Sequence, residues 1–107
     1  ERCIIHGDMK PINLLIDHDN RELYVSDWGL SLHYIPDNRQ SYHIASRHWK
    51  APELLFGFHE FNYAIDLWAV GIIMLEMLVG REHVLPAHHT HEQAALVARF
   101  VGVDEYE

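Results

Sequence analysis

In the first third of the chain, short apolar segments alternate with polar turns. Two such segments, residues 14–16 and 23–26, flank the polar residues 18–21. Short apolar segments on either side of a polar stretch are typical of two strands joined by a turn. This part of the sequence therefore predicts a small β-hairpin.

Later segments show the pattern of helices. Residues 63–79 are apolar on nearly every face of a 3.6-residue period, which predicts a helix enclosed by other elements. Residues 91–101 carry one apolar face and predict a second helix, with Thr90 and Gln93 as a capping box and Gly102 as the stop. Between residues 28 and 50 no period persists, which predicts a long irregular loop.

These segments predict a single α+β unit. No repeat, low-complexity run or linker divides the 107 residues. The chain begins with Glu1 and not with Met, and we expect it to be a fragment of a longer protein.

The charge balance narrows the classes of partner. Eight Lys and Arg oppose sixteen Asp and Glu, a net charge of −8 with the ten His counted as neutral. Binding to nucleic acid or to an anionic membrane needs a dominant basic surface, so we expect neither partner. The apolar stretch at residues 64–79 is interrupted by Asp66 and Glu76 and is shorter than the roughly 20 residues that cross a membrane.

Cysteine and histidine content bears on location and on metal binding. Cys3 is the only cysteine, so an internal disulfide and a thiolate metal site are both excluded. A chain that cannot form an internal disulfide is explained most simply by a reducing compartment, and we expect the protein in the cytoplasm and nucleus. A metal site remains an alternative for four clustered histidines, although their spacing fits no zinc pattern. They are His83, His88, His89 and His91.

Four motifs occur in a fixed order along the chain. They are His6-Gly7-Asp8-Met9-Lys10-Pro11-Ile12-Asn13, Asp27-Trp28-Gly29, Ala51-Pro52-Glu53 and Asp66-Leu67-Trp68-Ala69-Val70-Gly71. In order and spacing they resemble the catalytic loop, metal-binding triplet, end of the activation segment and following helix of eukaryotic protein kinases. A single motif would indicate little, because an Asp or Lys in a loop is usually a turn residue or a solvated charge.

The resemblance implies a protein kinase-like fold and a role for each polar residue. Residues 1–107 would be a partial kinase domain, the central part of the mostly helical C-terminal lobe, with the N-terminal lobe absent. Asp8 would accept the proton of the substrate hydroxyl, and Lys10 would contact the transferred phosphate of ATP. Asn13 and Asp27 would bind Mg²⁺, which prefers hard oxygen ligands.

Three other residues have structural roles in this resemblance. Asp66 would brace the backbone of the catalytic loop, and His6 would orient that loop without acting as a base. Gly29 would let the backbone turn just after the metal-binding Asp27.

Trp28, where most protein kinases have Phe, resembles the casein kinase II catalytic subunits. Residues 13–18, 44–55 and 89–93 fit the same pattern, and the resemblance extends from Cys3 to Tyr106. It implies a serine/threonine kinase that uses ATP and Mg²⁺ on Ser or Thr followed by acidic residues. It also implies a casein kinase II beta-type regulatory subunit as a partner.

The same resemblance assigns substrate and nucleotide contacts. Arg47 and Lys50 would hold the acidic residues of the substrate. His43 replaces a further Arg and is charged only part of the time near neutral pH, so acid recognition would be weaker or pH-dependent. The alternative is that these charges only pair with neighbouring acidic side chains. Leu15 would form the apolar floor under the adenine, and Ser26 occupies a position where the family has an apolar residue.

Two departures leave a second function open. Gly7 replaces the Arg that usually precedes the catalytic Asp, and it would add backbone freedom to the loop. The 107 residues contain no Gly-rich phosphate loop, strand Lys or helix Glu, so we expect the isolated chain to be inactive. The alternative is a non-catalytic interaction module derived from a kinase.

Overall fold

The structure, a computed structural model, describes residues 3–36, 45–58 and 60–102. Its elements are β1 (Ile4–Ile5), η1 (Pro11–Asn13), β2 (Leu14–Asp17), β3 (Glu22–Val25), β4 (Leu32–His33), η2 (Arg47–Trp49), α1 (Pro52–Leu55), α2 (Ala64–Val79) and α3 (Thr90–Phe100). The elements η1 and η2 are single turns of 3-10 helix. The described residues thus combine helices with two small antiparallel sheets, in agreement with the expected α+β class.

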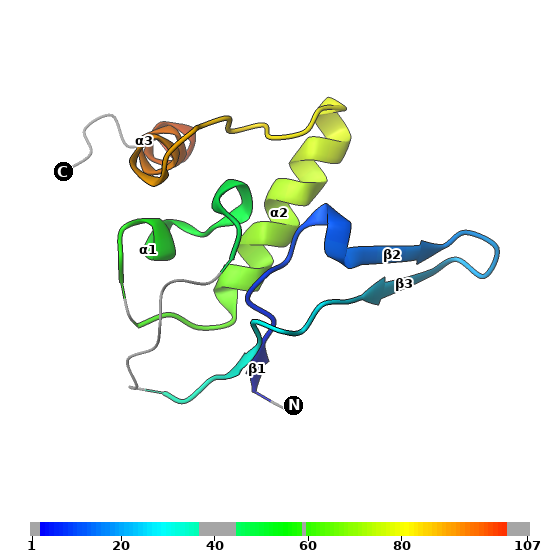
Figure 1. Ribbon diagram of the computed structural model, residues 1–107. Coiled ribbons are helices and arrows are strands. Elements are labelled where there is room, and N and C mark those ends of the chain that lie inside the picture. The colour runs from blue at the N-terminus through cyan, green and yellow to red at the C-terminus, as the bar shows by residue number, and fades with distance from the viewer. Residues whose placement is uncertain (1–2, 37–44, 59, 103–107) are drawn as a thin grey trace.

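Helix α2 runs through the middle of the structure, with the β2–β3 hairpin on one side and α1 and α3 on the other (Figure 1). In the hairpin, Leu14 lies opposite Val25 and Asp17 opposite Glu22. The Asp17 carboxylate accepts hydrogen bonds from the backbone N–H groups of Asp19 and Asn20, both at 3.1 Å, and from Nδ2 of Asn20 at 2.8 Å. The predicted hairpin is confirmed, with strand bounds that differ by one residue.

The segment predicted as an irregular loop contains regular elements near both of its ends. Strand β4 pairs antiparallel with β1, so that Ile5 lies opposite Leu32, and η2 forms close to the other end of the segment. A periodicity within the segment cannot reveal a strand whose partner lies far away in the sequence. Residues 37–44 lie outside the described residues.

Two clusters of buried side chains join the elements around α2. Their members are Ile5, Ala51, Leu54, Phe61 and Ile65 in the first cluster, and Leu55, Ala94 and Val97 in the second. Trp68 of α2 packs against both clusters. Because Ile5 directly precedes the polar loop that begins at His6, the first cluster fixes the start of that loop against α2.

Helix α2 forms as predicted, but the described residues do not enclose it. Leu67, Met77 and Leu78 are 71%, 76% and 83% exposed. The apolar pattern identifies the helix, whereas its enclosure needs neighbours that the described part of the chain does not supply on these faces. None of the described helices combines the length and apolar character that a membrane crossing requires.

Helix α3 begins and ends one residue earlier than predicted, and its cap differs. Thr90 is already helical, and the N-cap residue is His89, whose side chain makes no capping hydrogen bond. Glu92 instead accepts a hydrogen bond from the backbone N–H of His88 at 2.9 Å. The predicted capping box is therefore wrong. The predicted stop is confirmed, because Gly102 follows the helix with a φ of 92°.

Candidate active site

The carboxylate of Asp66, at the start of α2, holds the backbone of the polar loop. Its Oδ2 accepts a hydrogen bond from the N–H of His6 at 2.8 Å, and its Oδ1 accepts one from the N–H of Gly7 at 3.1 Å. A buried N–H group without a partner costs about 1–3 kcal/mol, so both bonds stabilise the loop against α2. The structural role expected for Asp66 is confirmed.

His6 is buried and links the loop to the end of the hairpin. Its Nδ1 accepts a hydrogen bond from the backbone N–H of Asp8 at 3.1 Å, and its Nε2 lies 2.9 Å from the carbonyl oxygen of Ser26. Because Nδ1 accepts, the ring proton lies on Nε2 and is donated to Ser26. Both ring nitrogens are occupied, so His6 orients the loop, as expected.

Gly7 lies between these two anchors with a φ of 85°. The N–H groups of His6, Gly7 and Asp8 all donate hydrogen bonds, so the loop is held at each position. The added backbone freedom expected from Gly7 stays a prediction. Glycine suits a left-handed conformation in which a Cβ atom would be strained.

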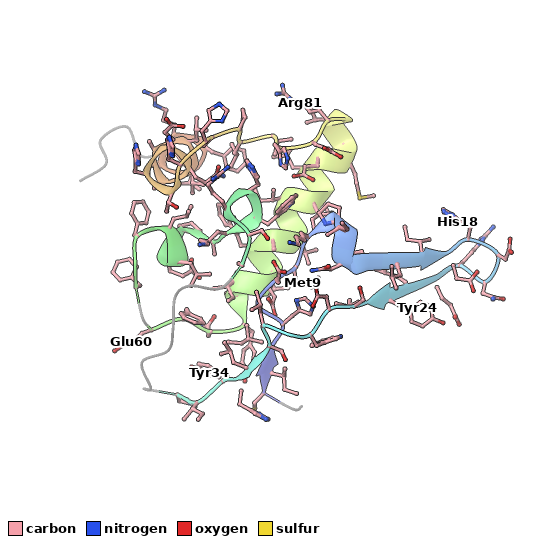
Figure 2. The ribbon with its side chains drawn as sticks, viewed as in Figure 1. Met9, His18, Tyr24, Tyr34, Glu60 and Arg81 are labelled. Atoms are coloured by element: carbon pink, nitrogen blue, oxygen red, sulfur yellow. The ribbon has the colours of Figure 1, made fainter. Side chains whose placement is uncertain are left out.

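Asp8 is buried, with its side chain 11% exposed, and its carboxylate lies at the centre of a polar cluster. Its Oδ1 accepts a hydrogen bond from the hydroxyl of Ser46 at 2.9 Å, and its Oδ2 lies 3.5 Å from Nζ of Lys10. Lys10 also donates to the Ser46 hydroxyl at 2.9 Å. In the view of Figure 2, Met9, the residue between Asp8 and Lys10, lies near the middle of the structure. Because Ser46 contacts both Asp8 and Lys10, the cluster brings together two segments that are far apart in the sequence.

Ser46 was not among the predicted site residues. It lies 38 positions after Asp8, and nothing in the spacing of the sequence links the two. Ala45, just before it, has a φ of 68°, which is uncommon for a residue with a Cβ atom. Ser46 directly precedes Arg47, which was a predicted site residue. Its contact with Asp8, however, is visible only in the folded chain.

Asn13 is buried and closes the cluster from η1. Its Nδ2 donates to the backbone oxygen of Asp8 at 2.8 Å and lies 3.4 Å from Asp8 Oδ2. With the amide nitrogen directed at Asp8, Oδ1 is the atom that can act as an oxygen ligand. The backbone oxygen of Asn13 accepts hydrogen bonds from the N–H of Ser26 at 2.8 Å and from its hydroxyl at 3.0 Å. The hairpin thus returns the chain to Asn13 immediately before Asp27.

Asp27 is exposed and has a φ of 58°. Asp adopts this left-handed conformation more readily than most residues that carry a side chain. Gly29 has no positive φ, and a Cβ atom at that position would lie at an ordinary contact distance of 3.5 Å from Asp27 Oδ1. The left-handed conformation is therefore adopted by Asp27 itself. Gly29 lies in the turn that directly follows, which a hydrogen bond from the N–H of Ser31 to the carbonyl oxygen of Trp28 closes at 3.0 Å, so the expected turn after Asp27 is confirmed.

The chemistry of these two side chains fits Mg²⁺. The oxygen atoms of Asn13 and Asp27 are hard donors, and Mg²⁺ in such sites keeps several waters and binds one or two protein ligands together with phosphate oxygens. A cluster of three or more His, Cys, Asp or Glu side chains that could hold a metal is not found in the part of the chain that the structure describes. That part includes the four histidines at positions 83–91.

Leu15 lies on strand β2 of the hairpin, and Ser26 directly follows strand β3. Leu15 is exposed and lies opposite Tyr24, whereas Leu14 and Ile16 point to the other face of the sheet. The hydroxyl of Ser26 is bonded to the backbone of Asn13. Its polar group is therefore satisfied within the protein, although the position is one where an apolar residue was expected.

Arg47 and Lys50 lie at the two ends of η2. Burial lowers the pKa of Lys50, and the positive charge of Arg47 lowers it further. Nε of Arg47 is buried without a hydrogen-bond partner. Among the described residues, the one ion pair within 4.0 Å joins Lys10 to Asp8, so the alternative of pairing with nearby acids is not seen there. His43, the third predicted substrate contact, lies outside the described residues.

Comparison with known proteins agrees with this arrangement. The family model described as "Protein kinase domain" matches residues 1–104. A "probable serine/threonine-protein kinase" of Dictyostelium discoideum is 34% identical over 102 residues, which cover 95% of this chain and 17% of that protein. The chain thus spans less than a fifth of the length of this curated relative. Because the family match includes nearly every residue, the chain belongs to the protein kinase domain family.

Proposed function

We propose that this chain is part of a serine/threonine protein kinase of casein kinase II type. Such an enzyme transfers the γ-phosphate of ATP to Ser or Thr in acidic sequence contexts. The observation that carries the proposal is the convergence of Lys10, Asn13 and Ser46 on the carboxylate of Asp8. In the proposed protein, residues 1–107 form the central part of the C-terminal lobe.

Asp8 is the proposed base. Ser46 and Lys10 contact its two carboxylate oxygens, so the side chain is oriented before a substrate arrives. Orientation of this kind removes a large part of the entropic barrier to reaction. The side chain of Lys10 is 25% exposed, and its ammonium would stabilise the negative charge of the transferred phosphoryl group.

Asn13 and Asp27 would hold Mg²⁺ through their side-chain oxygens. The bound metal would neutralise negative charge on the phosphates of ATP. Leu15 would contact the adenine through its exposed side chain, and Ser26 would lie beside it. Ser26 also supports the site indirectly, because its bonds to Asn13 keep the two ends of the hairpin together.

Arg47 and Lys50 would bind acidic side chains of the substrate. They are two neighbouring cations without a carboxylate partner among the described residues, and Lys50 is disfavoured in its charged form by burial and by Arg47. A bound carboxylate would offset both effects. Their local positive charge would attract an acidic substrate despite the net charge of −8. Through the resemblance, the proposal also includes His43 as a substrate contact and a beta-type regulatory subunit as a partner. Through the single cysteine, it includes a location in the cytoplasm and nucleus.

The test is phosphate transfer by the full-length protein with ATP and Mg²⁺. We expect transfer to a peptide whose Ser is followed by Asp and Glu, and much less to a matched peptide with Lys at those positions. Asp8→Ala should lower kcat by orders of magnitude, whereas Arg47→Gln should mainly raise KM for the acidic peptide. Wild-type turnover by Asp8→Ala would exclude the role of Asp8 as the base.

The non-catalytic alternative predicts a different result. A ligand that binds only the folded protein raises its Tm. We therefore expect ATP with Mg²⁺ to raise the Tm of the full-length protein, and Asp27→Asn to reduce that rise. A folded protein that shows neither the rise nor phosphate transfer would favour an interaction module over an enzyme.

A further inference from the structure

The imidazole rings of His48 and His83 are stacked outside the candidate active site. Their ring centres are 3.8 Å apart, and their planes meet at 29°. The ring of Trp49 packs against both, with centre distances of 5.8 Å to His48 and 5.5 Å to His83. His48 lies in η2, two residues after Ser46, and His83 lies between α2 and α3. The stack therefore ties the segment of Ser46 and Arg47 to the connection that follows α2.

The geometry favours two neutral rings. In each ring Nδ1 is buried and has no hydrogen-bond partner, and an N–H bond at such a position would lack an acceptor. Two charged rings at this separation would repel each other. His83 has a φ of 54°, a left-handed conformation that costs free energy for a residue other than Gly. Contacts such as the stack must compensate for that cost.

Charged and titratable groups approach the stack from several elements. They are Arg47 at η2, Glu76 of α2, and Arg81, Glu82 and His88 of the connection between α2 and α3. Lys50 lies near Arg47, and Glu92 of α3 lies near His88. Within the described ranges, none of the three carboxylates lies within 4.0 Å of either ring, and Glu92 is bonded to the backbone of His88. The positive charge of a proton added to the stack would therefore be repelled by Arg47, and no described carboxylate is close enough to either ring to offset that repulsion.

We propose that the His48–His83 stack is a pH-sensitive pair that positions η2, together with Ser46 just before it. When both rings are neutral, the stack holds η2 in the place where Ser46 contacts Asp8. In mildly acidic solution, protonation separates the rings and releases Ser46 and Arg47 from these positions. The effect on catalysis rests on the proposed kinase function, whereas the opening of the stack does not.

The direction of the effect follows from the environment of His48. Burial lowers the pKa of His48, and the charges of His83, Arg47 and His88 lower it further, while a hydrogen bond with the backbone of Leu85 acts in the opposite direction. The unfolded chain therefore binds a proton more readily than the folded chain. The stabilisation is complete above the ordinary pKa of histidine and is lost as the pH falls through the lowered value.

Variants of the full-length protein separate ring packing from titration. His48→Phe keeps a flat ring against His83 but cannot be protonated, and His48→Gln removes the ring. His33→Phe is the matched control, because His33 is an exposed histidine on β4, in an element other than η2. Tm and kcat/KM for the acidic peptide are measured between about pH 7.5 and about pH 5.5.

We expect kcat/KM to fall about tenfold or more over this range in the wild type and in His33→Phe, and about threefold or less in His48→Phe. The fall in Tm should likewise be smaller in His48→Phe, and His48→Gln should show a raised KM already at the higher pH. If His48→Phe does not fold, His83→Phe provides the same comparison. NMR titration of the wild-type protein should give His48 a pKa below the ordinary value of histidine.

The proposal is overturned if the Phe variants retain the full wild-type response to pH, or if the pKa of His48 is not below the ordinary value of histidine. Absence of phosphate transfer at every pH would contradict the proposed function instead. In that case the Tm and NMR measurements still decide whether the stack opens on protonation.

Discussion

The hydroxyl of Ser46 donates a hydrogen bond to Oδ1 of Asp8 at 2.9 Å, although 38 positions separate the two residues. The same hydroxyl accepts a hydrogen bond from Nζ of Lys10. Since a hydroxyl can donate and accept at once, Ser46 connects the proposed base to the proposed phosphate contact. It is a positioning residue, because it orders two charged groups through its own hydrogen bonds.

Replacing Ser46 with Ala should therefore lower kcat. A hydrogen bond to a charged group contributes about 1.5–3 kcal/mol, so we expect a loss of roughly 10- to 100-fold, with little change in KM for ATP. Ser46→Thr retains a hydroxyl and is the matched control. Steady-state kinetics of the full-length protein would check this, and a Ser46→Ala enzyme with unchanged kcat would show that the contact is dispensable.

Replacing Asp66 should destabilise the loop that carries Asp8. Asp66→Ala removes the acceptor for two backbone N–H groups, and we expect the free energy of unfolding to fall by about 2 kcal/mol or more. Asp66→Asn keeps one acceptor oxygen and should lose less. Urea denaturation measures the difference, and equal stabilities for all three proteins would contradict the bracing role.

Replacement by alanine should change the free energy of unfolding by different amounts at two glycines near the site. Gly7 has a φ of 85°, so Gly7→Ala should lower the free energy of unfolding by about 1–2 kcal/mol. Gly29 has no positive φ, and the added Cβ would meet Asp27 Oδ1 at 3.5 Å, so Gly29→Ala should change stability much less. Thermal denaturation of both variants provides the comparison, and a larger loss at Gly29 would reverse this interpretation.

The turn of the β2–β3 hairpin should show a carboxylate with a depressed pKa. A side-chain hydrogen bond from Asn20 lowers the pKa of Asp17 most, and backbone hydrogen bonds from Asn20 and Asp19 add to it. The stabilisation from Asp17 is therefore present above its pKa in the unfolded chain and is lost as the pH falls through the lower pKa of the folded chain.

Asn20→Ala should raise the pKa of Asp17 back towards its ordinary value. NMR titration of the Asp17 carboxyl carbon measures the change. His18→Ala is the matched control, since it alters the same turn, at the tip of the hairpin (Figure 2), without removing the bonds from Asn20. A shift of the same size in both variants would mean that the side-chain bond from Asn20 is not its cause.

Local features of the sequence were sufficient for the hairpin and for helices α2 and α3. Each depends on a period of side chains within one segment or on a local turn, such as Asp17 to Asn20 or Gly102 at the end of α3. The bracing by Asp66 was also accessible from the sequence, through the resemblance of its motifs to those of kinases. These features need no information about segments that are distant along the chain.

Other features could not be predicted from the sequence because they depend on backbone conformation. Thr90 fits a capping pattern, yet the chain enters the helix one residue earlier, at His89. Gly29 is a natural turn residue, yet the left-handed φ is found at Asp27. The residue type permits such conformations, and neighbouring contacts select where they occur.

By itself, therefore, the sequence determined the local elements and the set of polar residues from which the site is built. Only the tertiary structure decided that β1 pairs with β4, that Ser46 joins Asp8 and Lys10, and that His48 stacks on His83. The physical reason is that these contacts join residues separated by long stretches of chain. Their positions are set by the packing of β1, α1 and α3 around α2, which no local pattern of side chains encodes.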